Sequence, residues 1–347
     1  MRGLQVRPFD AATTTQDEWR RFHAYRRVRW FEEFPDDPLP TDADTEAELR
    51  IERPQHDVRR WLAWIDGEPT GLLHVFFRRA GTAGSEAHAR YLDFAGGVPR
   101  ARRRQGIGRA LLREMAGFME QHGKTLASTK SWSADADGFL ARVGAQCRWR
   151  NVDSRLQMER VDAGELARLA AAADADPALR WELHFGRVPW DVLPGLMEPF
   201  TTLINDQPLE DLDIPRMQYR LEGYPSWYAE LDAHGSAHVV VLLRAGDDVA
   251  AMSEAFWDAR TPQWLHQKLT GVARPWRGRG LAAAVKSRLL ELVRQRLPQV
   301  RTVKTYNARA NAPMLAVNRR LGFAVYRDES TWQLERVALA SYLATPD

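Results

Sequence analysis

The sequence predicts a mixed α/β protein made of two tandem copies of one domain. One glycine-containing motif, Arg-x-x-Gly-x-Gly/Ala, occurs at 103–108 and again at 277–282. Each copy follows a strand-like segment and precedes an amphipathic helix, and both halves of the chain show one order of elements. At 347 residues the chain is long for one domain and sufficient for two that each bury a core. Duplication therefore explains the pattern better than two unrelated domains do.

The first half of the chain alternates between strands and helices. A strand is expected at 4–8, and Thr15 is a cap-like start for the helix that follows. A second helix is expected over 42–50. Two apolar runs flank the turn at 66–69 and predict a hairpin. The remaining expected elements are a strand at 89–98 before the first motif, an amphipathic helix after it, a strand at 125–131, a helix that ends at Gly144 and a strand at 149–158.

An alanine- and aspartate-rich segment at 163–177 predicts a short helix and a linker. It separates a first domain, 1–162, from a second domain, 178–347. The second half repeats the order of the first. Its expected elements are a strand at 181–185, a helix at 190–203, a hairpin over 237–257, a strand at 262–272, a helix after the second motif, a strand at 300–306, a helix at 312–321, and two closing strands at 323–327 and 331–335.

Composition excludes several classes of protein. The net charge is only +3, from 49 basic and 46 acidic residues, which is poor evidence for nucleic-acid binding. No apolar run reaches transmembrane length, and the N-terminus has no apolar signal core. Cys147 is the only cysteine, so an internal disulfide is excluded and no zinc site is indicated. We therefore expect a cytoplasmic protein with no nucleic-acid, membrane or metal partner.

The repeated motif is typical of an anion-binding turn. Glycine lets the backbone approach a phosphate closely. The first N–H groups of the following helix have no intrahelical partner, and the helix dipole is positive at that end. The motif differs from the Gly-x-Gly-x-x-Gly of dinucleotide-binding folds and lacks the Gly-Lys-Ser/Thr end of a P-loop. Both turns are therefore expected to bind a phosphate-bearing ligand.

In this context the motif resembles the pyrophosphate-binding turn of the GNAT superfamily of N-acetyltransferases. The elements Val-Gly-Ala at 143–145 and Leu-Gly-Phe at 321–323 resemble the end of the family helix that lies beside CoA. Segments 267–272 and 305–323 also resemble a group of bacterial tandem acetyltransferases. The resemblance implies two tandem acyl-CoA N-acyltransferase domains that use acetyl-CoA as co-substrate.

The resemblance also implies the residues that bind acetyl-CoA. The pantetheine arm would pair with the backbone near Val98 in the first half and Val272 in the second, with Asn311 close to it. The diphosphate would lie on the two turns. These are Arg103, Arg104, Gln105, Gly106, Ile107 and Gly108, and Arg277, Gly278, Arg279, Gly280, Leu281 and Ala282.

His266 is the first candidate for the catalytic base. Several family members carry a Glu or His 11 residues before the motif, and His266 has that position here. Strand alternation places it on the same side as Thr270 and Val272. The alternative interpretation is a histidine at the surface or at the edge of the core. Glu254 and Asp258 on the preceding strand are rival bases, and the amine could also lose its proton through a chain of waters.

The usual acid of the family, a tyrosine four residues before the glycine of Leu-Gly-Phe, is missing from both halves. Leu140 and Asn318 have these positions. Leu140 cannot donate a proton, and Asn318 can donate only a hydrogen bond. Tyr306 and Tyr326 are candidate substitutes. A thiol has an ordinary pKa of about 8.5, so a thiolate can leave without a protein acid.

We expect an N-acetyltransferase that moves an acetyl group to a primary amine of a small molecule. The second domain is expected to be catalytic because it keeps the fuller set of motifs, including Asn307, Asn311 and Asn318. The alternatives are a non-catalytic acyl-CoA-binding or regulatory protein, and an N-acetyltransferase that acts on proteins or peptides. The sequence does not define the acceptor, the number of CoA sites, or the choice between a monomer and a homodimer.

Overall fold

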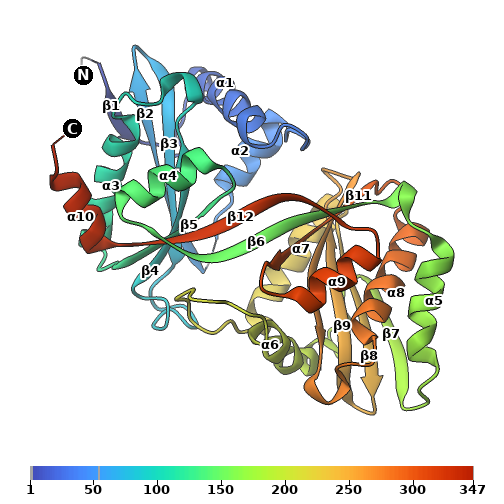
Figure 1. The fold of residues 1–347 in the computed structure, drawn as a ribbon. Coiled ribbons are helices and arrows are strands. Elements are labelled where there is room, and N and C mark those ends of the chain that lie inside the picture. The colour runs from blue at the N-terminus through green and yellow to red at the C-terminus, as the bar shows by residue number, and fades with distance from the viewer. Residues whose placement is uncertain (1–2, 54, 347) are drawn as a thin grey trace. The chain divides into compact units, whose positions relative to one another are not determined.

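The computed structural model describes residues 3–53 and 55–346 (Figure 1). The chain divides into two compact units. The first unit comprises the residues up to Arg148 together with those from Ser330 onward, and the second unit comprises Trp149–Glu329. The strand order is β1-β2-β3-β4-β5-β12 in the first unit and β6-β11-β10-β9-β8-β7 in the second. Both sheets are mixed and carry helices on both faces, so the expected fold class is confirmed.

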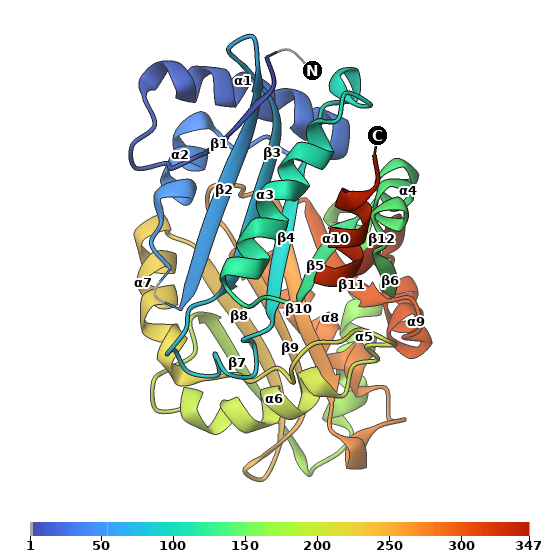
Figure 2. The same ribbon diagram turned by 90° about the vertical axis from the view of Figure 1, so that its left-hand side faces the viewer.

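In the first unit, α3 packs on one face of the sheet and α1 on the other (Figure 2). A core around Met115 lies under α3, and a smaller core around Phe22 lies under α1. The C-terminal helix α10, which the sequence pattern did not predict, packs against α3. The elements are β1 (Gln5–Pro8), α1 (Gln16–Glu33), α2 (Asp42–Arg50), β2 (His56–Ile65), β3 (Glu68–Arg78), β4 (Tyr91–Gly97), η1 (Arg100–Arg102), α3 (Ile107–Gln121), β5 (Leu126–Ser131), α4 (Ala134–Val143) and α10 (Arg336–Ala344).

In the second unit, α5 and α8 cover one face of the sheet, and α6 and α7 cover the other. Most of the segment 163–177, expected to hold a short helix and the linker, forms α5, whose buried face packs on α8. The elements are β6 (Gln146–Gln157), η2 (Met158–Arg160), α5 (Ala163–Asp174), β7 (Leu179–Gly186), η3 (Leu193–Leu196), α6 (Met197–Asn205), η4 (Leu221–Gly223), α7 (Tyr224–His234), β8 (Ala237–Ala245), β9 (Asp248–Trp257), β10 (Trp264–Val272), η5 (Arg274–Trp276), α8 (Leu281–Arg296), β11 (Thr302–Ala308) and α9 (Ala312–Arg320). The strand β12 (Ala324–Glu335) begins among the residues of this unit, and its part from Ser330 onward belongs to the first unit.

The final strand of each half pairs in the sheet of the other half. In the second unit, β6 runs antiparallel to β11, with Asn151–Gln157 opposite Thr302–Ala308. In the first unit, the end of β12 runs antiparallel to β5, with Ser330–Glu335 opposite Leu126–Ser131. The predicted repeats 1–162 and 178–347 are halves of the sequence, whereas the compact units are divided near Arg148 and Glu329.

The two closing strands expected at 323–327 and 331–335 are one continuous strand, β12. The sequence Asp-Glu-Ser at 328–330 has the composition of a turn, which is why a break was expected there. Glu329 and Ser330 are instead buried and hydrogen-bonded. Glu329 accepts a hydrogen bond from the Asn151 amide at 3.3 Å, and the Ser330 hydroxyl donates to Asp137 at 2.9 Å. Paired polar side chains of this kind are tolerated inside a sheet.

None of the helices within 3–53 and 55–346 combines the length and the apolar character needed to cross a membrane.

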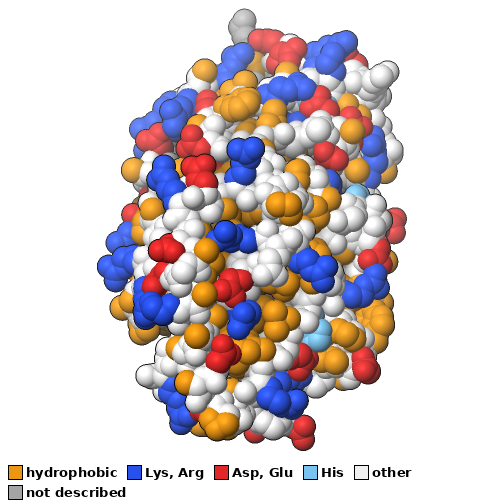
Figure 3. Space-filling view, turned by 90° about the vertical axis from the view of Figure 1, so that its right-hand side faces the viewer, with side chains coloured by type: hydrophobic (Ala, Val, Ile, Leu, Met, Phe, Trp, Pro, Cys, Tyr) orange, Lys and Arg blue, Asp and Glu red, His pale blue; other side chains and the backbone are white. Residues whose placement is uncertain are grey.

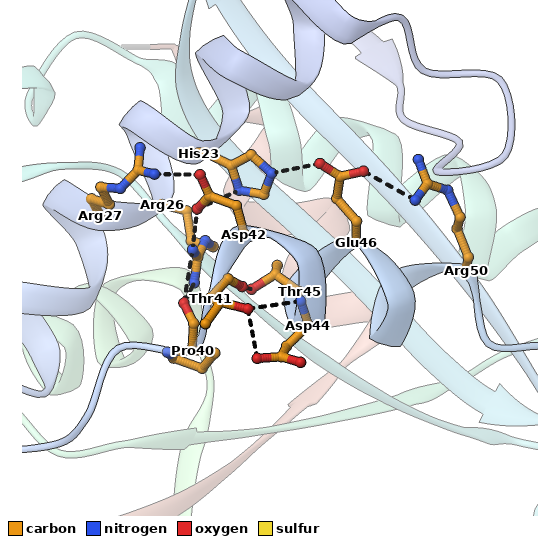
Figure 4. Close-up of polar contacts among 10 residues, drawn as sticks. All are labelled: His23, Arg26, Arg27, Pro40, Thr41, Asp42, Asp44, Thr45, Glu46 and Arg50. Carbon is orange, nitrogen blue, oxygen red and sulfur yellow. Dashed lines mark hydrogen bonds and ion pairs between the residues drawn. The ribbon is translucent and has the colours of Figure 1, made fainter. Parts of the chain in front are cut away.

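A polar network joins α2 to α1 in the first unit (Figure 4). His23 of α1 is buried at 3% exposure, with Nε2 3.1 Å from Glu46 and Nδ1 3.4 Å from Asp42. Arg26 donates to Asp42 at 2.8 Å, and Arg50 pairs with Glu46 at 3.0 Å. No residue of α2 is buried. Leu49 of α2 packs partly buried against the core around Phe22, so α2 is attached by this contact and by the charged groups.

Acid is expected to release α2 from α1. The hydrogen bond with His23 lowers the pKa of Glu46 below its ordinary value. Burial raises the pKa of Asp42, but the hydrogen bond from Arg26 and the nearby charges outweigh it and the net pKa is lowered. A carboxylate with a lowered folded pKa stabilises the fold above its unfolded pKa, and that contribution is lost as the pH falls through the folded value. Hydrogen-exchange protection of α2 should therefore fall below about pH 4.

Glu46→Gln provides the matched comparison at neutral pH. The exchange of the α2 amides should rise by up to roughly fivefold, the range expected for partly exposed ion pairs. The amides of α3 should not change. Equal protection of α2 in both proteins, at neutral and at acid pH, would contradict this account of how α2 is held.

Candidate functional site

The two motif turns have the same backbone conformation. After β4 and after β10 the chain makes a short 3-10 turn, η1 or η5, and then enters the left-handed region twice. The φ angles are 60° at Arg104 and 65° at Gly106, and 79° at Gly278 and 78° at Gly280. Gly106 and Gly280 directly precede α3 and α8. A non-glycine residue with φ near 60° is uncommon. Because Arg104 nevertheless has a left-handed φ like that of Gly278, both turns share the same backbone conformation.

The helix N-termini after these turns are open. No side chain caps α3 or α8. Among the contacts of the described residues, the backbone N–H groups of 104–108 and 278–282 have no acceptor. No atom lies within 4 Å of the position that a Cβ would take at Gly278 or Gly280. Unpartnered amides at a helix N-terminus, with open space in front of them, fit the diphosphate of a CoA ester.

The first arginine of each motif braces its turn against the preceding strand. Arg103 Nε donates to the carbonyl of Val98 at 3.3 Å, and Arg277 Nε donates to the carbonyl of Val272 at 3.0 Å. Arg277 also pairs with Asp206 at 2.7 Å. The hydrogen bond from Arg274 is the main cause of the lowered pKa of Asp206, and the hydrogen bond from Arg277 adds to it. In both copies this arginine fixes the spacing between strand end and helix start.

A cavity of about 350 Å³ lies beside the second turn. Its lining includes Arg279 and Leu281 from the turn and Asp176 from the segment after α5. Arg279 lies 3.4 Å from Asp176, with its guanidinium 4.7 Å from the ring centre of Trp276. The turn therefore combines backbone donors with a basic side chain at the edge of a hollow.

In each unit the two central parallel strands separate shortly before the turn. β4 pairs with β5 only over Tyr91–Asp93, although its pairing with β3 continues to Gly97. β10 pairs with β11 only over Trp264–Gln267, although its pairing with β9 continues to Val272. Within the described residues, the pairing of each of these strands with its parallel neighbour thus ends several residues before the turn. An extended arm can pair with a strand edge as an added strand.

The register of β9 and β10 overturns the expected orientation of His266. Before the shift between Gln267 and Thr270, His266 lies opposite Phe256, which packs with the core under α6 and α7. After the shift, Val272 packs with the core under α8. The prediction that His266 shares a side with Thr270 and Val272 is therefore wrong. A bulge of one residue reverses the alternation of all side chains beyond it.

Glu254 lies at the centre of a buried hydrogen-bond network on the α6/α7 face. The Glu254 carboxylate only accepts, so a neutral His238 carries its proton on Nε2, and its Nδ1 accepts from the Tyr228 hydroxyl at 3.1 Å. Tyr228 also accepts from the Val188 N–H at 3.1 Å. His238 Nε2–H then donates to Glu254 Oε1 at 3.0 Å, and the Tyr219 hydroxyl donates to Oε2 at 3.2 Å. Burial and then the charge of Glu254 raise the pKa of Tyr219. This network holds an oriented carboxylate.

The position of Glu254 relates it to the opening between β10 and β11. The partners on either side of the bulge are Ala255 with Gln267 and Ser253 with Thr270. Glu254 therefore lies opposite the bulge itself, on the neighbouring strand, where β10 leaves β11. It is 6% exposed.

Asp258, the other rival base, lies beyond the end of β9 and pairs with Arg260 at 2.7 Å. Burial acts to raise its pKa, but the hydrogen bonds from Arg260 outweigh that effect and the net pKa is lowered. A carboxylate engaged in this way is a weaker base than one of ordinary pKa.

Asn318, at the position of the missing acid, lies in a chain of polar side chains that the sequence did not suggest. Its Oδ1 accepts from Lys286 Nζ at 2.5 Å, and its Nδ2 donates to Asn307 Oδ1 at 2.6 Å. Lys286 is 1% exposed. It shares an apolar helix face with Leu289, Leu290 and Val293. A lysine on an apolar face of a predicted helix is a sequence signal for a buried polar group, and the sequence analysis missed it. His238, inside the apolar strand 237–243, was a similar signal.

The other predicted residues have different surroundings. Tyr306 precedes Asn307 on β11 and is 42% exposed on the opposite face of the strand. Tyr326 lies under the guanidinium of Arg155, 3.3 Å from the ring centre. Asn311 caps α9, because its Oδ1 accepts from the Met314 N–H at 3.2 Å.

The corresponding end of β4 in the first unit is covered by α1. The Tyr25 hydroxyl donates to the Gly97 carbonyl at 2.8 Å, and a Cβ at Gly97 would lie 2.4 Å from Arg29. Glu32 accepts from the Arg100 N–H at 2.9 Å. Leu140, where the family acid is expected, is buried. The first unit therefore keeps the turn, but its strand end carries polar groups from its own helix.

Within the described residues, no group of three or more His, Cys, Asp or Glu side chains could hold a metal ion.

Comparisons with known proteins agree with this geometry. The model of the acetyltransferase (GNAT) family matches residues 19–145, which lie in the first half of the chain. The fold is similar to that of a tandem GNAT protein from the clavulanic acid biosynthesis pathway, with a TM-score of 0.72, 22% identity, and coverage of 96% of this chain and 98% of that chain. It is also similar to a GCN5-related N-acetyltransferase from Sphaerobacter thermophilus, with a TM-score of 0.66, 15% identity and 96% coverage of both chains. No curated protein sequence matches the chain.

Proposed function

We propose that this chain, whose residues 19–145 match the acetyltransferase (GNAT) family model and whose fold is that of a tandem GNAT protein, is an acetyl-CoA-dependent N-acetyltransferase. The acceptor is a primary amine of a small molecule, and the second unit is the catalytic one. One observation carries the proposal. The oriented carboxylate of Glu254, on β9, lies opposite the bulge at which β10 leaves β11, and β10 leads from that bulge to the Gly280 turn.

Each part of this arrangement has a role in the reaction. Acetyl-CoA supplies an acetyl group activated as a thioester. The amides of 278–282 hold the diphosphate, and the end of β10 near Val272, beyond its pairing with β11, pairs with the pantetheine arm. Glu254 accepts the proton of the incoming amine. The amine nitrogen bonds to the acetyl carbon while the carbon–sulfur bond breaks, and the electron pair of that bond remains on sulfur.

The contrast between the two units supports a catalytic second unit. In the first unit, Tyr25 and Arg29 engage the strand end at Gly97, where the arm would have to pair. The matching residue in the second unit, Gly271, is covered by the apolar side chain of Leu203. Leu140 also gives the first unit no polar group near the sulfur. We infer that the first unit binds CoA without turnover or supports the fold.

A small-molecule acceptor also fits the charges of the chain. On the face shown in Figure 3, basic and acidic side chains are interspersed and neither gathers into one extended patch. The net charge is +3. A nucleic-acid partner would be expected to require a concentrated basic surface. Cytoplasmic location, and a monomeric or homodimeric state, remain predictions from the sequence.

Radiolabelled acetyl-CoA with a panel of small primary amines tests the proposal. The expected result is an acetylated small amine, with formation of product reduced in Glu254→Gln. A panel of peptides serves as the comparison. Product on peptides alone would favour the protein acetyltransferase, and CoA binding without product on either panel would favour the acyl-CoA-binding protein.

A further inference from the structure

Lys286 is a buried lysine whose amine has no carboxylate partner among the described contacts. It lies on α8 at 1% exposure, with Nζ 4.8 Å from the ring centre of Phe323 and 2.5 Å from Asn318 Oδ1. Burial lowers its pKa to about 7. A buried ammonium costs free energy that an apolar side chain at the same place would not. A role other than stability therefore explains this lysine best.

The chemistry of the ammonium gives the hydrogen-bond chain a direction. Lys286 Nζ donates to Asn318, so the group of Asn318 that faces the lysine is the carbonyl oxygen. The Asn318 amide nitrogen must then point the other way, and it donates to Asn307 Oδ1 at 2.6 Å. Because the side-chain oxygen of Asn307 accepts this bond, its amide nitrogen, with two N–H donors, is left to donate to a further acceptor.

The position of Asn307 shows where these donors are. Pairing between β10 and β11 ends at Gln267 and Thr305, and Asn307 follows two residues later on β11. Asn307 is half-buried, and its amide nitrogen has no partner among the described contacts. It therefore lies along the opening between the two strands, at the end of a hydrogen-bond chain that begins at Lys286. Each hydrogen bond in such a chain polarises the next, so its last donor is strengthened.

We propose that Lys286 is a positioning residue that acts through Asn318 to direct the amide of Asn307 into the opening between β10 and β11, where that amide donates to the sulfur leaving from the thioester. This inference rests on the proposed function. No proton is transferred in this step: the carbon–sulfur bond breaks, sulfur keeps the electron pair, and the Asn307 N–H stabilises the thiolate. Asn318 stands at the position of the usual tyrosine acid and relays the interaction. Asn307, the next member of the hydrogen-bond chain, supplies the hydrogen-bond donor.

The pKa of the thiol of bound CoA, followed by the ultraviolet absorbance of its thiolate, tests the inference without turnover. We expect the wild-type protein to lower this pKa below that of free CoA. Lys286→Met and Asn307→Leu should each restore the free value. Lys286→Gln, which keeps an N–H donor to Asn318, should preserve at least part of the lowering. In turnover, kcat should fall roughly 10- to 100-fold in Lys286→Met while KM for acetyl-CoA changes little, because the lost donor acts on the leaving group.

Two controls separate a positioning role from a structural one. Lys124→Met removes a second buried lysine, which donates to the Ala89 carbonyl in the first unit, and it should leave the thiol pKa unchanged. Binding of desulfo-CoA should be the same in all variants, because it lacks the sulfur. An unshifted thiol pKa in wild-type protein that binds CoA would overturn the inference and leave the proposed function standing. A thiol pKa that is lowered equally in wild type and Asn307→Leu would overturn it even if Lys286→Met does not fold. Failure of the wild type to bind any CoA would instead overturn the proposed function.

Discussion

Gly280→Asp is expected to abolish CoA binding at the second turn, with a loss in affinity of roughly 1000-fold. The new carboxylate would lie at the helix N-terminus that is proposed to hold the diphosphate. Two like charges about 4 Å apart repel by about 4 kcal/mol near a protein surface, which corresponds to a factor of about 1000 in Kd. Calorimetric titration with acetyl-CoA measures both the affinity and the number of sites.

Two variants separate the charge from the backbone. Gly280 has φ 78°, and no atom lies within 4 Å of the position of its Cβ. Asparagine tolerates the left-handed conformation, so Gly280→Asn adds a neutral side chain of similar size and should weaken binding much less than the aspartate does. Gly106→Asp makes the matching change in the first unit. Unchanged affinity and stoichiometry in Gly280→Asp would disprove the placement of the diphosphate.

Glu254→Gln is expected to lower kcat by about 100-fold or more, the usual range for loss of a general base. The amide cannot accept the proton of the incoming amine. Tyr219 and His238 would still surround the side chain, so the geometry of the network is largely kept. Because Glu254 does not contact the proposed diphosphate turn, KM for acetyl-CoA should change little. Steady-state kinetics with the best acceptor of the amine panel measures both constants.

His266→Gln is the comparison for this prediction. His266 lies on the same face as Phe256, on the side of the sheet covered by α6 and α7, and the sequence made it the first candidate for the base. If Glu254 is the base, His266→Gln should retain most of the activity. Full activity in Glu254→Gln together with loss of activity in His266→Gln would transfer the role to His266.

Local signals were sufficient to predict the elements and the turns. The helix expected over 42–50 is α2, and the cap expected at Thr15 forms a capping box with Glu18. The left-handed turns follow from glycine spacing, which is a property of a few consecutive residues. The sequence pattern also placed Glu254 and Asn318 near the site, although it ranked His266 first.

Non-local features could not be predicted in the same way. The bulge near Gln267 adds one residue to β10 without any glycine or proline to indicate the break, and the reversed side of His266 follows from it. The network around Glu254 joins Tyr219 and His238, which are far apart in the sequence, so no spacing rule reveals it. The partner of Lys286 comes from another helix, and only the packing of α8 against α9 brings the two together.

The pairing of β6 with β11 and of β12 with β5 has a consequence for how the gene product can be divided. A chain cut between 162 and 178 would yield two fragments, each of which carries the closing strand of the other fragment's sheet. Neither fragment alone could satisfy the hydrogen bonds at the edge of its last remaining strand, so the two should be insoluble apart and should recover their structure when mixed. The arrangement is that of a strand-swapped dimer whose two subunits have been fused into a single polypeptide.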